Sequence, residues 1–142
     1  MTVQEQILKV IKGKDILIFE NDNTCNDSIG RFEKFLIDNK VTYNVLYQID
    51  TLPFDYIVEQ LGWFDIYAFQ TTWGSDVAKK LNQHIATMKN KKKIIECYIN
   101  EPSWFYHPKG VKHDVYVLNS YEEEIAEWEF HKLRRNKAIW EK

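Results

Sequence analysis

Polar side chains that could bind a ligand follow the first apolar stretch of the chain. Residues 15–19 read DILIF, and the polar run ENDNTCNDS comes directly after them at residues 20–28. A strand, a turn and a helix start in this order present free backbone N–H groups and the positive end of a helix dipole, which attract an anion. The run therefore predicts a ligand-binding turn with Asp22, Thr24, Asn26 and Ser28 as candidate contacts.

A second group of candidates combines hydroxyls with large aromatic rings. The turn after residues 64–71 contains Thr72, Trp73 and Ser75, and the irregular stretch of residues 100–113 contains Trp104 and Tyr106. Tryptophan and tyrosine rings offer flat apolar faces for stacking together with a polar group for hydrogen bonding. These five residues are predicted to contact the ring and the polar groups of a ligand.

The apolar pattern predicts the elements that would position these residues. Strands are expected at residues 15–19, 41–49, 64–71, 94–99 and 115–118, and helices before the first strand and after residues 26, 51 and 75. Ser120 and Glu123 resemble a capping box, so a last helix is expected from Tyr121 towards the end of the chain.

Strands that alternate with helices indicate an α/β fold, a three-layer sandwich with a mostly parallel five-stranded sheet in a single domain of residues 1–142. The strand-end turns would then meet at one edge. Residues 100–113 are short for a parallel crossover. The direction of the fifth strand therefore stays open, with an antiparallel edge position as the alternative.

Composition restricts the partners. A net charge of −2 argues against nucleic acid, and no apolar run approaches the roughly 20 residues of a membrane span. Cys25 and Cys97 lie far apart and form no metal or disulfide signature, so no metal site is predicted and the cytoplasm is the expected compartment. The basic run at residues 89–93 is interpreted as a solvated helix end, at the edge opposite the ligand-binding turns.

The order of elements resembles flavodoxin-like proteins. The turn at residues 22–27 is similar to their hydroxyl-rich phosphate loop, with Thr24 and Asn26 at matching positions, and the loop at residues 72–74 resembles the one that carries a ring-stacking aromatic. The resemblance implies FMN, with its phosphate on backbone N–H groups near residues 24–28. Trp73 would then lie against the flavin ring, and Trp104 or Tyr106 opposite it.

Two other families share features of the same turn. Cys25 before a helix is similar to a monothiol glutaredoxin, although a cysteine without a redox role is the preferred interpretation. Residues 18–24 resemble the first motif of haloacid dehalogenases, with Glu20 in place of the nucleophilic aspartate, which implies a Mg²⁺-dependent phosphate or nucleotide hydrolase.

The functional expectation is a small cytosolic protein that binds FMN or another nucleotide at the carboxyl edge of the sheet. FMN implies electron transfer, and a nucleotide implies sequestration or hydrolysis, so whether a reaction is catalysed stays open. The alternative is a ligand-free interaction protein that contacts a protein partner or a second copy through the aromatic stretch at residues 100–113 and the last helix.

Overall fold

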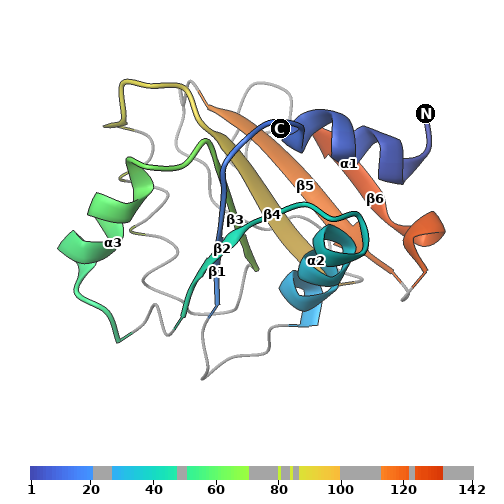
Figure 1. Ribbon diagram of the computed structural model, residues 1–142, viewed down its shortest axis with the longest axis horizontal. Coiled ribbons are helices and arrows are strands. Elements are labelled where there is room, and N and C mark those ends of the chain that lie inside the picture. The colour runs from blue at the N-terminus through green and yellow to red at the C-terminus, as the bar shows by residue number, and fades with distance from the viewer. Residues whose placement is uncertain are drawn as a thin grey trace, which may run out of the picture.

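The computed structural model describes residues 1–20, 27–47, 51–70, 80, 84, 87–99, 113–121 and 124–132. Its strands form one sheet in the order β2-β1-β3-β4-β5-β6 (Figure 1). The strands are β1 (Ile16–Phe19), β2 (Asn44–Leu46), β3 (Ile66–Gln70), β4 (Lys93–Ile99), β5 (Asp114–Ser120) and β6 (Glu129–Lys132). Strands β1 to β5 run parallel, and β6 is antiparallel to β5. The chain therefore has an α/β fold built on a mostly parallel sheet.

Helices cover both faces of the sheet (Figure 1). Because successive residues of a strand point to opposite faces, Ile16 and Ile18 join one apolar core while Leu17 and Phe19 join the other. Helices α1 (Val3–Ile11) and α2 (Asp27–Asp38) pack on the first face, and α3 (Phe54–Leu61) packs on the second. The core residues that these helices contribute are Ile7, Ile11, Ile29, Phe32, Phe35, Leu36, Ile57 and Leu61.

Local signals explain the bounds of α1. The backbone N–H of Glu5 donates to the Thr2 hydroxyl over 3.1 Å, so Thr2 caps the helix start, and that hydroxyl in turn donates to the Glu5 carboxylate. Gly13 follows the helix with a φ of +70°, a conformation that side chains with a Cβ rarely adopt. The helix therefore ends where the chain must turn into β1.

The expected helix after residue 75 falls mostly outside the described residues. Lys80, His84 and Thr87 have helical backbone. Met88 packs against the core of the second face, and the His84 ring meets the Phe54 ring edge to face at 6.2 Å. These contacts place the described part of this segment beside α3.

The structure decides the direction of the fifth strand, which the sequence left open. Strand β5 pairs in parallel with β4 along its whole length, from Asp114 opposite Lys93 to Ser120 opposite Ile99. An antiparallel fifth strand is therefore wrong.

The segment after β5 differs from the last helix that the sequence predicted. In place of the helix expected from Tyr121, the described residues form the short 3-10 helix η1 (Ile125–Glu127) and then β6, so the sheet has six strands and not five. Trp128 between them is only 5% exposed, and its ring lies 6.2 Å from that of Phe35 on α2. This aromatic contact holds the segment against the core. The helix pattern in the sequence does not predict this contact.

No helix within the described residues is both long and apolar enough to span a membrane.

The Trp128 contact gives a test of how β6 is held. Replacing Trp128 with Ala should lower the free energy of unfolding by about 3–5 kcal/mol, because a large buried ring is lost and a cavity remains. Trp128→Phe keeps an aromatic ring against Phe35 and should cost less than about 2 kcal/mol. Urea unfolding followed by circular dichroism measures both variants. An Ala variant as stable as the unmodified chain would show that this ring does not anchor β6.

Candidate functional site

Polar side chains gather near the carboxyl ends of the parallel strands and at the residues that directly follow them. Strands β1 to β5 all end at one edge because they run in the same direction. The buried or half-buried polar residues at this edge are Glu20, Gln70, Glu96, Tyr98, Asn119 and Ser120. Buried polar groups cost stability unless they are hydrogen-bonded, and polar groups that gather at the carboxyl edge of an α/β sheet mark the usual ligand-binding region.

The two turns that were expected to converge do begin side by side. Phe19 is paired with Phe69 in the parallel β1–β3 ladder, so Glu20 and Gln70, the next residues of each chain segment, leave the sheet at the same edge. The ligand-contact candidates beyond them lie outside the described residues: Asp22, Thr24, Asn26, Thr72, Trp73, Ser75, Trp104 and Tyr106. Their assignment remains a prediction.

Ser28 is the one predicted contact that the structure describes, and its backbone is already engaged. The Gln70 side-chain oxygen accepts hydrogen bonds from the backbone N–H groups of Ser28 at 3.0 Å and Ile29 at 3.2 Å. These are first-turn groups of α2, which have no partner inside the helix. The Ser28 hydroxyl is fully buried, and no hydrogen-bond partner is found for it among the described residues. An anion bound to these two amides would have to replace Gln70.

A hydrogen-bonded carboxyl pair lies beside this helix start. Glu33 on α2 shares a side-chain hydrogen bond with Glu20 at the end of β1, and the Tyr43 hydroxyl donates to Glu33 from the segment before β2. Burial raises the pKa of Glu33 from 4.5 to about 8, the hydrogen bond and charge of Glu20 add to this effect, and the Tyr43 hydrogen bond opposes it. Near neutral pH the pair therefore holds one proton between two carboxyl groups.

The opposite face of the sheet holds a third carboxyl at the same edge. Glu96 in β4 is fully buried between Phe69 of β3 and Val117 of β5, and the Tyr98 hydroxyl donates to its Oε2 atom over 3.2 Å. The first face has Cys97 at the next position of β4. Burial raises the pKa of this thiol, and the charges of Glu96 and Glu33 raise it further, so Cys97 is a core residue and not a reactive thiolate. Cys25 lies outside the described residues.

Glu33, Tyr43 and Gln70 are site residues that the sequence interpretation missed. Glu33 follows Ile29 by one helical turn, so a carboxyl stands at the border of the buried stripe of α2. That position could have identified Glu33, because charged residues seldom border a core without a partner. The Gln70 contact joins groups 42 positions apart, and a single sequence contains no local signal for it.

The arrangement can donate and accept protons, and it offers hydrogen bonds to a ligand at the edge of the sheet. No group of three or more His, Cys, Asp or Glu side chains that could hold a metal ion is found in the described part of the chain. A divalent cation at the Glu20–Glu33 pair would therefore need further oxygen ligands, such as those of a phosphate.

Comparison with models of known protein families, with curated proteins and with solved structures gives no match to this chain. Its function therefore has to be inferred from its own residues.

The shared proton predicts how stability depends on pH. The folded state binds more protons than the unfolded chain between pH 4.5, the ordinary pKa of Glu33, and about 8, its folded value. Stability from this group is thus fully present below pH 4.5 and is lost as the pH rises towards 8. Glu33→Gln should remove this loss and stabilise the protein by about 1–2 kcal/mol at pH 9, after allowance for solvent screening of a partly exposed pair. Urea unfolding between pH 5 and pH 9 measures this difference in stability. The control is Glu59→Gln, which removes an exposed carboxyl from α3.

The Gln70 contact predicts a loss of stability that phosphate restores in part. Gln70→Ala leaves the amides of Ser28 and Ile29 without their acceptor and should cost about 1 kcal/mol, the usual effect of losing a helix cap. Inorganic phosphate should then stabilise this variant more than Gln60→Ala, a control on α3, because only the first variant exposes helix-start amides. Equal phosphate effects on the melting temperatures of the two variants would show that these amides do not bind anions.

Proposed function

We propose that the protein binds a small ligand with a phosphate and an aromatic ring, FMN or another nucleotide, at the carboxyl ends of β1 and β3. The observation that carries this proposal is the position of β1 between β2 and β3. The chain passes from β1 to one neighbour and then to the other, and ligands of α/β sheets bind in the crevice outside such a reversal. The order β2-β1-β3-β4-β5 is also that of flavodoxin-like proteins, which supports the resemblance in the loops.

Side chains around this crevice supply suitable contacts. Glu20 and Gln70 flank it from β1 and β3, and Tyr47, whose side chain is 57% exposed, directly follows the end of β2. An exposed tyrosine beside polar groups suits stacking against a flat ring. Tyr47 therefore joins Trp73, Trp104 and Tyr106 as a candidate for ring contact.

The proton on the Glu20–Glu33 pair lowers the electrostatic repulsion between these carboxyl groups and a bound phosphate. Two ionised carboxyl groups beside a phosphate would repel it, but the raised pKa of Glu33, near 8 because of burial and Glu20, leaves the pair with one negative charge at neutral pH. Gln70 occupies the amides of Ser28 and Ile29, so the phosphate is assigned to the turn at residues 21–26. With FMN the function would be electron transfer, and with a nucleotide it would be sequestration or hydrolysis.

A Mg²⁺-dependent hydrolase is a second candidate, favoured by the contact between Glu20 and Glu33. Glu20 and Glu33 would hold a divalent cation, whose positive charge beside a phosphate would turn repulsion into attraction. The alternative of a ligand-free interaction protein relied on a last helix and on the aromatic stretch at residues 100–113. The described residues within 121–132 form η1 and β6 in place of that helix, and Trp104 and Tyr106 of the stretch lie outside the described residues.

Ligand binding is tested with the full chain in a thermal-shift panel of FMN and nucleotides, each with and without Mg²⁺. A ligand at about 100 times its Kd should add about 2.7 kcal/mol of stability. The Trp73→Ala variant should lose the shift, whereas Trp63→Ala should keep it, because Trp63 is 74% exposed in the turn before β3, at the opposite edge. Colourless protein that responds to no member of the panel would refute the proposal. A response that appears only with Mg²⁺ would favour the hydrolase.

A further inference from the structure

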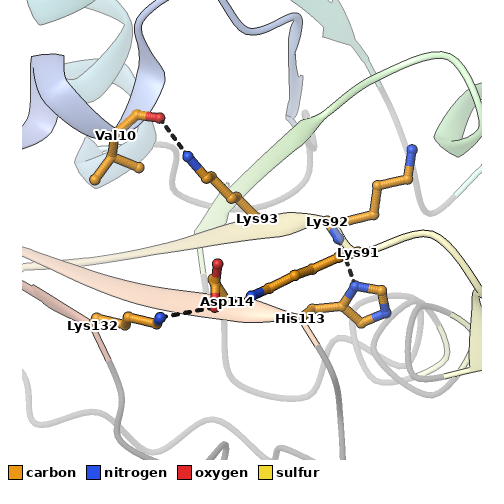
Figure 2. Close-up of polar contacts among 7 residues, drawn as sticks. All are labelled: Val10, Lys91, Lys92, Lys93, His113, Asp114 and Lys132. Atoms are coloured by element: carbon orange, nitrogen blue, oxygen red, sulfur yellow. Dashed lines mark hydrogen bonds and ion pairs between the residues drawn. The ribbon is translucent and has the colours of Figure 1, made fainter.

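Lysine side chains gather at the edge of the sheet opposite the proposed crevice. Asp114 at the start of β5 forms ion pairs with Lys91 at 3.2 Å and with Lys132 of β6 at 2.9 Å. Lys93 of β4 donates from Nζ to the backbone oxygen of Val10 over 3.0 Å. Figure 2 shows the Lys91 and Lys132 side chains converging on Asp114, with Lys93 directed towards α1. Asp114 therefore pairs with two ammonium groups, and the third, that of Lys93, contacts a backbone oxygen.

The basic run at residues 89–93 is thus at the edge expected from the sequence, but it is not simply solvated. Lys92 is only 8% exposed, and its Nζ atom donates to the backbone oxygen of Phe64 over 2.8 Å. Its backbone N–H donates to Nδ1 of buried His113, also over 2.8 Å (Figure 2). Lys92 therefore has a structural role, whereas Lys91 and Lys93 face the side where α1 lies.

A pocket of about 430 Å³ opens beside this cluster, between α1 and the amino ends of β4 and β5 with the end of β6. Its ammonium groups belong to Lys9 of α1, Lys93 and Lys132, and no carboxylate is found among its described lining residues. Tyr116 and Phe130 line it as well, with ring centroids 5.3 Å apart and planes 3° from parallel. The pocket thus combines an excess of positive charge with an apolar aromatic wall.

Asp114 neutralises only part of the positive charge of the lysines around the pocket. Burial alone would raise the pKa of Asp114, but the hydrogen bonds and positive charges of Lys132 and Lys91 lower it overall, so it is ionised at neutral pH. Lys93 meets a neutral carbonyl at the end of α1, where the helix dipole contributes only a partial negative charge. Lys9 forms no ion pair within the described part of the chain. Ammonium groups that face one pocket repel each other, and an external anion would relieve this repulsion.

We propose that this pocket binds a small organic oxyanion, a phosphate or carboxylate on a flat apolar body, with the oxyanion at Lys9, Lys93 and Lys132 and the body against Tyr116 and Phe130. The volume lies in the usual range for small-molecule sites. The net charge of −2 for the whole chain provides no long-range field for a polyanion. The site is at the opposite edge from the crevice between β1 and β3, so it is independent of the function proposed above.

The test is a titration of the ¹⁵N-labelled full chain with phenyl phosphate and with benzoate, followed by amide chemical shifts. Both anions should shift the amides of Lys93, Phe130 and Lys132 at saturable concentrations. Inorganic phosphate should bind more weakly because it lacks the apolar body. Phenol and benzylamine, which lack the negative charge, should leave these amides unchanged. Equal shifts with phenol, or no saturable shift with either anion, would overturn the proposal.

Charge variants separate a binding site from a structural cluster. Lys9→Gln should weaken phenyl phosphate binding about threefold to fivefold, the usual effect of losing one exposed ionic contact. Lys89→Gln removes the same charge from the same edge but outside the pocket, and it should change the affinity little. Asp114→Asn releases Lys91 and Lys132 from their intramolecular partner and should tighten binding. Affinity that is unchanged in both Lys9→Gln and Asp114→Asn would overturn the assignment.

Discussion

The parallel pairing of β1 with both of its neighbours is the constraint on which the rest of the structure depends. Phe19 lies opposite Phe69 of β3 and Leu46 of β2, so three chain segments leave the sheet at one edge. The same pairing places Glu20 where it meets Glu33 of α2, and Gln70 where it meets the start of that helix. Local polar contacts at the edge thus follow from the direction of buried apolar strands.

The two edges of the sheet have different electrostatic character. The described carboxyl edge gathers Glu20, Glu33 and Glu96, and one of these carboxyl groups is neutralised by a shared proton. The amino edge gathers lysines that pair with Asp114 and with backbone oxygens. Lysine and carboxylate ions are costly to bury unless they are paired or hydrogen-bonded. The polar groups at each edge therefore contribute to the structure through these contacts.

Much of the fold could be predicted from the sequence because its signals are local. The stripe Ile29, Phe32, Phe35 and Leu36 identifies α2, and the apolar run at residues 16–19 identifies β1. The last segment could not be predicted in this way. Ser120 and Glu123 resemble a helix start, but Ser120 ends β5 with its side chain buried, and Trp128 is buried against Phe35 of α2. Tertiary burial overrides such local preferences.

The candidate site was predictable only in outline. The edge at which the strand-end turns begin follows from parallel strands, and the structure confirms it for Glu20 and Gln70. The partners across that edge were not predictable, because the contacts of Gln70 with Ser28 and of Glu33 with Tyr43 depend on how α2 docks, and no single residue pattern records that. The same limit applies to the amino edge, where neighbouring lysines of one basic run have different roles: Lys91 pairs with Asp114, Lys92 is buried, and Lys93 lines a pocket.

The strands at the two ends of the sheet have a consequence for self-association. β2 is only three residues long, and β6 reads EFHK with its charged side chains exposed. The most apolar strands, β1 and β3, are enclosed between neighbours, and their backbone groups are already paired. Short and charged border strands are poor templates for intermolecular hydrogen bonding. Fibril-like growth by strand addition is therefore disfavoured even though the interior strands are rich in aromatic and aliphatic residues.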